Sequence, residues 1–280
     1  MKSILEVLNA STDFLAKKGV ESPRLQTELI MAHVLEIGRM QLYLEFERVL
    51  NEKELAPLRE MIKRRGRREP LQHIIEETEF HGLKVKCSPK ALVPRPETEY
   101  LVELVVKKLG ENAQGVIYDI GTGSGVIALS LAHELNNAEF VAVDVDDHAL
   151  RLAEENGAAY PHLKVSWQKG DLLKGVKDQG ALAVVANLPY LTSDEMKHLN
   201  PEVQQDPYSA LHGGEDGLDL VRHLIKQSVE IATWIFLEIG IKHGSIVKEL
   251  LLEAGYIDVE VHEDLLKRER FVVAKKAGES

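Results

Sequence analysis

A polar and aromatic motif follows an apolar run in the second half of the chain. The run at 182–186 has the composition of a buried parallel strand, and Asn187-Leu188-Pro189-Tyr190 comes directly after it. Because Pro189 lacks an N–H and restricts Leu188 to an extended conformation, we expect the Leu188 carbonyl to point into a crevice. With the Asn187 side-chain oxygen it offers two acceptors, which suit a planar –NH₂ group. An ordinary strand-to-loop turn capped by Asn is the competing interpretation.

A glycine-rich segment precedes this motif. Residues 119–125 read Asp-Ile-Gly-Thr-Gly-Ser-Gly, between a strand-like run at 115–118 and a helix-like run at 126–132. Such glycines let a ligand approach the backbone closely, and the two candidate ligands are a dinucleotide and the methyl donor S-adenosylmethionine. A dinucleotide loop has its third glycine three positions after the second, where this chain has Val126. The spacing therefore favours the methyl donor, whose cationic head Asp119 would face.

The next strand-like run, at 140–143, ends in Asp144. A carboxylate at this position can accept hydrogen bonds from both hydroxyls of a ribose, as it does in dinucleotide sites. Asp144 therefore indicates a ribose but does not distinguish the two ligands. The glycine spacing, Asp119 and the motif at 187–190 together favour a methyltransferase.

The pattern of elements predicts an α/β protein with a small helical bundle before it. Residues 1–75 carry only helical signals, including capping boxes at Ser3 and Asn51. Residues 76–95 alternate and contain turn residues, which predicts a β-hairpin linker. From residue 96 strands alternate with helices, which predicts a doubly wound, Rossmann-like sheet with its ligand crevice at the strand carboxyl ends. The expected strands lie near 115–119, 139–144, 163–168, 182–187, 234–239, 257–262 and 270–275, the last two pairing antiparallel.

Composition limits the class of protein. The chain has 280 residues, 44% of them hydrophobic, and a single cysteine, which excludes a disulfide framework and a cysteine metal cluster. We see no signal peptide and no apolar stretch of membrane-spanning length, so we expect a cytoplasmic protein without membrane contact. No metal site is expected.

Charge is distributed unevenly. Residues 1–75 hold 13 basic and 11 acidic side chains, whereas the whole chain has a net charge of −11. The net negative charge therefore lies in the residues after 75, where the catalytic domain is expected. This acidic part disfavours direct binding to nucleic acid, which needs a basic face for the phosphates. A basic run at 63–68 has two open interpretations. It is either a solvated helix end that complements the helix dipole, or a contact to an acidic or RNA-associated partner.

Several further strings resemble one known family over nearly the whole chain. They include Arg-Glu-Pro-Leu-Gln at 68–72, Pro-Arg-Pro-Glu-Thr-Glu at 94–99, Asp-Pro-Tyr-Ser at 206–209 and Gly-Gly-Glu-Asp-Gly at 213–217. With the glycine loop and the motif at 187–190, the chain resembles the release-factor glutamine methyltransferases, the HemK/PrmC family. Two positions depart from the family. The motif usually has Pro where this chain has Leu188, as in rRNA adenine dimethyltransferases, and Glu is common where this chain has Asp206.

The resemblance implies a class I S-adenosylmethionine-dependent methyltransferase sheet at 96–280, a hairpin linker at 76–95 and a substrate-recognition bundle at 1–75. It implies methyl transfer to the side-chain nitrogen of the glutamine in the Gly-Gly-Gln loop of class I peptide chain release factors, leaving S-adenosylhomocysteine. Alternatives are a ribosomal-protein glutamine methyltransferase, an rRNA adenine methyltransferase and a catalytically silent donor-binding protein. The expected catalytic and substrate-binding residues are Asn187, Leu188, Pro189 and Tyr190. The expected donor-binding residues are Asp119, Gly121, Thr122, Gly123, Ser124, Gly125, Asp144, Asp171, Leu172 and Asn187, joined by Arg95 and Pro96, which the resemblance places along the donor site.

Overall fold

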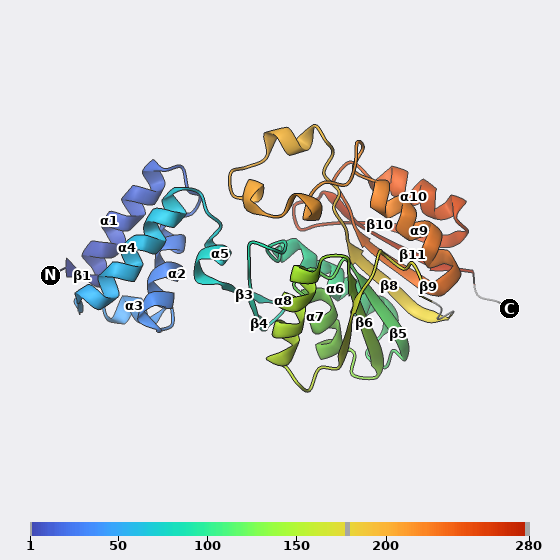
Figure 1. The fold of residues 1–280 in the computed structure, drawn as a ribbon, viewed down its shortest axis with the longest axis horizontal. Coiled ribbons are helices and arrows are strands. Elements are labelled where there is room, and N and C mark those ends of the chain that lie inside the picture. The colour runs from blue at the N-terminus through green and yellow to red at the C-terminus, as the bar shows by residue number, and fades with distance from the viewer. Residues whose placement is uncertain (1, 177–179, 278–280) are drawn as a thin grey trace. The chain divides into compact units, whose positions relative to one another are not determined.

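The computed structural model describes residues 2–176 and 180–277 (Figure 1). The chain forms two compact units. The first comprises Met1–Glu77 together with Asn200–Gln205, and the second comprises Thr78–Leu199 and Asp206–Ser280. A short segment from the second half of the chain therefore belongs to the N-terminal unit.

The first unit is a helical bundle, as the sequence predicts. Its helices are α1 (Ile4–Lys17), α2 (Pro23–Leu35), α3 (Gln41–Leu44), α4 (Glu52–Gly66) and α5 (Leu71–Ile75), with short paired strands β1 (Lys2–Ser3) and β2 (Val49–Leu50). Both expected capping boxes are present. Ser3 accepts from the Glu6 N–H at the start of α1, and Asn51 accepts from the Glu54 N–H at the start of α4. Apolar side chains of α1, α2 and α4 form one buried cluster.

The basic run at the end of α4 is largely used inside this unit. Arg64 binds the Glu69 carboxylate with two nitrogens, at 2.5 and 2.9 Å. Arg65 is only 3% exposed, and both Arg65 and Arg68 donate to Glu202, at 2.6 to 2.8 Å. Arg65 and Arg68 therefore hold the bundle and the segment Asn200–Gln205 together, whereas Arg64 bonds within the bundle. These ion pairs differ from the solvated helix end that the sequence analysis offered, and the alternative of a partner contact stays a prediction.

The second unit is built on a seven-stranded sheet in the order β10-β11-β9-β8-β5-β6-β7. Strands β5 to β9 pair parallel, and β11 lies antiparallel between β9 and β10. All seven predicted strands and the antiparallel last pair are confirmed. The bounds are β5 Gly115–Ile120, β6 Ala138–Asp144, β7 Val165–Lys169, β8 Ala181–Asn187, β9 Ala232–Glu238, β10 Tyr256–Glu263 and β11 Glu269–Lys276.

Helices cover both faces of this sheet (Figure 1). They are α6 (Pro96–Leu109), α7 (Val126–Glu134), α8 (Asp147–Ala158), α9 (Asp219–Ile231) and α10 (Gly244–Glu253). Alternate residues of β8 enter separate cores. Ala183 and Val185 pack with α6 and α7, whereas Val184 and Ala186 pack with α9 and α10. A strand buried on both faces explains the unbroken apolar run that the sequence shows there.

The remaining elements are short. Strands β3 (Glu77–Phe80) and β4 (Leu83–Lys86) form a separate two-stranded sheet, and 3-10 turns occur at Glu195–His198, Val203–Gln205 and Tyr208–Ala210. Among the described residues no helix is both long and apolar enough to cross a membrane. The strand order reverses between β5 and β8, because β6 follows β5 on one side while β8 and β9 lie on the other. Open α/β sheets bind their ligands at such a reversal.

Candidate active site

A cavity of about 150 Å³ lies at the carboxyl ends of β5, β6 and β8. The structure thus brings the glycine loop and the motif at 187–190 to one place, where the strand reversal predicts a ligand. The sequence-predicted residues that line the cavity are Gly121, Gly123, Asp144, Asp171, Leu172, Asn187, Leu188 and Pro189.

The glycine loop connects β5 to α7 and lies against β6. The N–H groups of Gly121 and Thr122 both donate to the Val143 carbonyl, at 2.8 and 3.0 Å. Gly121 has a φ of +72°, and a Cβ there would lie 2.9 Å from Leu188 Cδ2. Gly123 has a φ of +57° and open space where its Cβ would be. The first glycine therefore permits contact with the motif, and the second leaves room for a ligand beside the backbone.

Asp119 lies beneath the glycine loop and is not among the cavity-lining residues. Its Oδ2 accepts from Thr122 Oγ1 at 2.6 Å and from the Ala128 N–H at 3.1 Å, which fixes the loop onto the first turn of α7. Its Oδ1 is buried and has no hydrogen-bond partner among the described residues. Burial raises the pKa of Asp119 to about 7. The predicted contact of Asp119 with the cationic head of a donor stays a prediction, because Asp119 does not line the cavity.

Asp144 ends β6 and faces the cavity. Its Oδ2 accepts from the Gly123 N–H and its Oδ1 from the Asp146 N–H, both at 2.9 Å. These two bonds orient the carboxylate and leave further lone pairs, because each oxygen can accept more than one hydrogen bond. Burial raises the pKa of Asp144. The arrangement suits a pair of ribose hydroxyls, which fits the methyl donor that the sequence predicts.

Asn187 ends β8, and its amide is held from one side. Its Nδ2 donates to Thr98 Oγ1 at 3.1 Å, and Thr98 Oγ1 donates to Glu238 Oε2 at 2.7 Å. No described residue donates to Asn187 Oδ1 or to the Leu188 carbonyl oxygen. Two acceptors at the cavity wall thus remain available, as the sequence analysis requires for an –NH₂ group.

Tyr190 lies next to these residues but does not line the cavity. Its hydroxyl accepts from Arg270 Nη2 at 3.0 Å, and the guanidinium carbon lies 5.2 Å from the ring centroid. Burial raises the pKa of Tyr190, so the hydroxyl stays protonated at neutral pH. Arg270 Nη2 also lies 3.4 Å from Glu238 Oε1. Tyr190 is therefore fixed by the same group of buried charges that lies beneath Asn187.

The loop containing Gly213 and Gly217 packs against the backbone of the motif. A Cβ on Gly213 would lie 2.4 Å from the Pro189 carbonyl oxygen. A Cβ on Gly217, which has a φ of +80°, would lie 2.2 Å from the Tyr190 carbonyl oxygen. Gly213 and Gly217 of the Gly-Gly-Glu-Asp-Gly string are thus required by this close approach.

Other predicted residues lie outside the cavity. Arg95 forms an ion pair of 2.6 Å with the buried Asp206, and Pro96 is an exposed residue at the first turn of α6. Ser124 and Gly125 belong to the buried turn into α7. Sequence reasoning missed several lining residues, although Pro207 and Ser209 belong to the Asp-Pro-Tyr-Ser string. The missed residues are Lys90, Ala91, Leu92, Val143, Val145, Asp146, Ala149, Gly170, Pro207, Ser209, Ala210 and Leu220.

The strand order, the glycine loop bonded to Asp144, and the strand-end Asn-x-Pro-Tyr motif are those of a class I methyltransferase fold. Solved structures agree on the fold. A methyltransferase from Pyrococcus furiosus is 21% identical with a TM-score of 0.54, covering 70% of this chain and 90% of its own. The hMettl16 catalytic domain, solved with an RNA hairpin, is 19% identical with a TM-score of 0.58 and 81% coverage of each chain.

Sequence comparisons identify the family. Residues 6–75 match the family described as PrmC N-terminal domain, and residues 98–206 match the methyltransferase small domain. The release factor glutamine methyltransferase of Geobacter sulfurreducens is 36% identical over 94% of this chain and 93% of the relative. That of Deinococcus radiodurans is 37% identical over 98% of both. The chain belongs to the release factor glutamine methyltransferase family.

Proposed function

We propose that this protein transfers the methyl group of S-adenosylmethionine to the side-chain nitrogen of the glutamine in the Gly-Gly-Gln loop of class I peptide chain release factors. The observation that carries the proposal is a pair of acceptors at the wall of the cavity, Asn187 Oδ1 and the Leu188 carbonyl, to which no described residue donates. A glutamine amide presents two N–H groups, which match these acceptors. Such a reaction belongs in the cytoplasm, where release factors act.

The chemistry depends on positioning. The donor, when bound, supplies a methyl group already activated on a sulfonium sulfur. An amide nitrogen is a poor nucleophile, because its lone pair is delocalised into the carbonyl. Holding both N–H groups aligns the nitrogen for attack, and alignment of this kind contributes up to about 7–11 kcal/mol. The two oxygens also stabilise the positive charge that develops on nitrogen in the transition state.

The donor would be held by the other side of the same cavity. Asp144 is oriented by two backbone N–H groups and offers its remaining lone pairs to ribose hydroxyls. Gly123 leaves space for the donor beside the backbone. Asp171 and Leu172 line the cavity from the loop after β7.

The test is direct methylation. The protein is incubated with labelled S-adenosylmethionine and purified class I release factor, and the modified residue is mapped by mass spectrometry. We expect one methyl group on the glutamine of the Gly-Gly-Gln loop and none on a release factor in which that glutamine is replaced. Because Leu188 also occurs in rRNA adenine dimethyltransferases, rRNA is included as a second substrate. Label in rRNA and none in the release factor would contradict the proposal.

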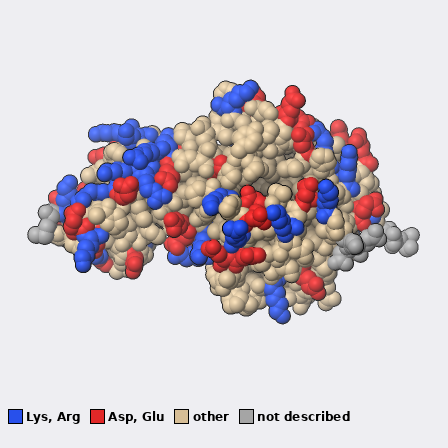
Figure 2. All heavy atoms as spheres, viewed as in Figure 1, with Lys and Arg blue, Asp and Glu red and all other residues tan. Residues whose placement is uncertain are grey.

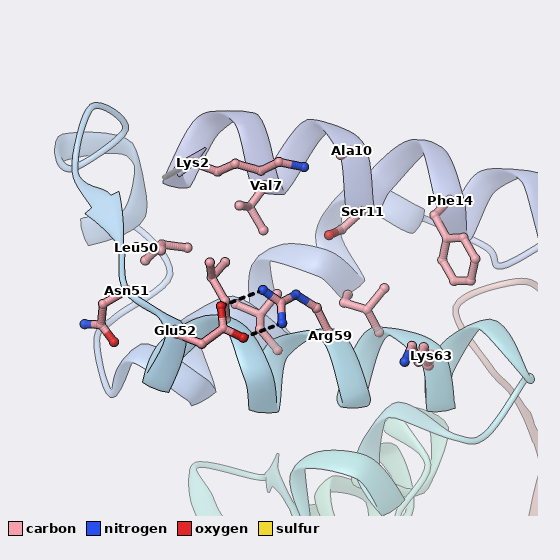
Figure 3. A pocket seen from close by; sticks show the side chains of 13 residues that line it. Lys2, Val7, Ala10, Ser11, Phe14, Leu50, Asn51, Glu52, Arg59 and Lys63 are labelled. Atoms are coloured by element: carbon pink, nitrogen blue, oxygen red, sulfur yellow. Dashed lines mark hydrogen bonds and ion pairs between the residues drawn. The ribbon is translucent and has the colours of Figure 1, made fainter.

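We also propose that the helical unit contacts the release factor through a hollow between α1 and α4 (Figure 3). The hollow has a volume of about 790 Å³. Figure 3 shows Val7 and Phe14 of α1 facing α4 across it. Further apolar residues that line the hollow are Ala10 of α1 and Leu55, Leu58 and Ile62 of α4.

Charge at the rim of the hollow indicates the chemistry of the contact. Lys2, Arg59 and Lys63 line it, and the one acidic lining residue, Glu52, is bound by Arg59 at 2.6 and 2.9 Å. Figure 2 shows Lys and Arg side chains gathered on the part of the chain that Figure 1 colours blue. A partner segment with apolar side chains and acidic flanks complements this surface.

Charge reversal on α4 tests this contact in the full-length protein. Lys63→Glu is expected to lower kcat/KM for intact release factor about tenfold and to leave kcat/KM for a short Gly-Gly-Gln peptide unchanged. Lys53→Glu is the matched control, because Lys53 is exposed on the same helix outside the hollow. Equal kcat/KM values for the two variants on intact release factor would refute the role of the hollow.

A further inference from the structure

Three polar side chains from separate elements form one hydrogen-bonded chain beneath the cavity. Asn187 at the end of β8 donates to Thr98 in α6, and Thr98 donates to Glu238 at the end of β9. Thr98 is 3% exposed and Glu238 is 1% exposed. Asn187 and Glu238 are neighbours in the parallel register of β8 and β9. Of these three residues, Asn187 lines the cavity, and Thr98 and Glu238 do not.

The direction of these hydrogen bonds follows from the charge at their buried end. An ionised carboxylate can only accept, so the single hydroxyl proton of Thr98 is used on Glu238. The Thr98 oxygen can then only accept from its other neighbour, which must present an N–H. The –NH₂ end of Asn187 is therefore held toward Thr98, and its oxygen is directed away from it.

We infer that Thr98 and Glu238 are positioning residues for methyl transfer, which fix the Asn187 amide so that its oxygen faces the acceptor nitrogen. The inference rests on the proposed function and goes beyond it by assigning two residues that touch neither substrate nor donor. If the Asn187 amide were reversed, an –NH₂ group would face the –NH₂ group of the acceptor. One of the two transition-state acceptors would be lost.

The surroundings of Glu238 make this arrangement sensitive to pH. Burial raises the pKa of Glu238 to about 7, and the nearby charge of Glu97 acts in the same direction. The Thr98 bond and the charges of Arg270 and Arg95 act in the opposite direction. When Glu238 is protonated, its own O–H can donate to Thr98. The Thr98 hydroxyl is then free to donate to the Asn187 oxygen, and the amide can reverse.

Substitutions of Thr98 test the positioning role. Thr98→Val keeps the shape of the side chain and removes the hydroxyl, and we expect kcat on a Gly-Gly-Gln peptide to fall about 10²-fold. Affinity for S-adenosylhomocysteine should stay at the wild-type value, and Thr98→Ser should restore most of kcat. The matched control is Thr27→Val, which removes another buried threonine hydroxyl, bonded to the Pro23 carbonyl in the helical unit. A folded Thr98→Val protein with wild-type kcat would overturn the inference.

A second measurement does not depend on turnover. The side-chain amide of Asn187 is followed by proton–nitrogen NMR, and its signals are assigned by their loss in Asn187→Asp. In the wild type we expect these signals to shift with a midpoint near pH 7, whereas in Glu238→Gln they should not titrate. An identical titration in both proteins would refute the control by Glu238. A failure of the proposed function would instead leave the NMR titration intact and abolish methylation by the wild type.

Discussion

Replacing Asn187 by Ala removes one of the two acceptors that the cavity offers to the substrate amide. Loss of one preorganised hydrogen-bonding group that acts on transition-state charge costs roughly 10²–10³ in kcat, or about 2.7–4 kcal/mol. The Leu188 carbonyl, which Pro189 restrains, is unaffected and supports the residual rate. Donor binding should change little, because the proposed donor contacts are made by Asp144 and the glycine loop, which line another part of the cavity.

The same substitution has a small cost in stability. Asn187 Nδ2 is the group that donates to Thr98 Oγ1, so its loss leaves that buried oxygen with one bond fewer. A hydrogen bond of this kind contributes about 1 kcal/mol to the free energy of unfolding. Natural domains have about 5–15 kcal/mol in total, so the variant should remain folded.

The assay is single-turnover methylation of a Gly-Gly-Gln peptide at saturating donor, with calorimetry of S-adenosylhomocysteine binding as the second measurement. Asn137→Ala is the matched control, because it makes the same substitution at an exposed position before β6. A rate for Asn187→Ala within about threefold of the Asn137→Ala rate would refute the two-acceptor reasoning. A large loss of donor affinity would show instead that Asn187 holds the donor.

Three further substitutions test the donor side and the loop that supports the motif. Asp144→Ala should weaken S-adenosylhomocysteine binding by about 1.5–3 kcal/mol, measured by calorimetry, and an unchanged Kd would mean that the ribose is held elsewhere. Gly217→Ala places a Cβ 2.2 Å from the Tyr190 carbonyl oxygen at a φ of +80°, so urea unfolding should show a loss of about 1–3 kcal/mol together with lower kcat. Burial raises the pKa of Asp119 from 3.8 to about 7. Between about pH 4 and pH 7 the carboxyl is therefore protonated in the folded state and ionised in the unfolded state. The stability of the donor-free protein should fall as pH rises through this range. Asp119→Asn should reduce that slope in denaturant unfolding, while Glu238, whose pKa is also raised to about 7, keeps its own contribution. A slope equal to that of the wild type would contradict the assignment.

The sequence predicted those parts of the fold that local patterns determine. Seven strands, the antiparallel last pair and two capping boxes follow from periodicity, turn residues and short-range side-chain bonds. The meeting of the glycine loop with Asn187 also follows, because parallel strands place their carboxyl ends at one edge of the sheet. The position of Glu238 beside Asn187 was not predicted, because it depends on the pairing of β8 with β9, which no local pattern encodes.

Two other features depend on contacts between distant parts of the chain. Arg68 and its partner Glu202 are 134 positions apart, so neither interpretation of the run at 63–68 included this ion pair. Tyr190 was expected among the substrate-binding residues, and in the structure it is held by Arg270, 80 positions further along, and does not line the cavity. Its role in substrate binding stays a prediction.

The position of β11 has a consequence for the synthesis of this protein. This strand follows all the other strands in the chain, yet it lies between β9 and β10 in the interior of the sheet. Arg270, which contacts both Tyr190 and Glu238, is its second residue. On a ribosome, the earlier strands emerge first, so β9 lacks its neighbour on one side and β10 lacks its partner strand until β11 emerges. The interior of the sheet and the surroundings of Tyr190 and Glu238 are thus completed together, only when β11 leaves the exit tunnel.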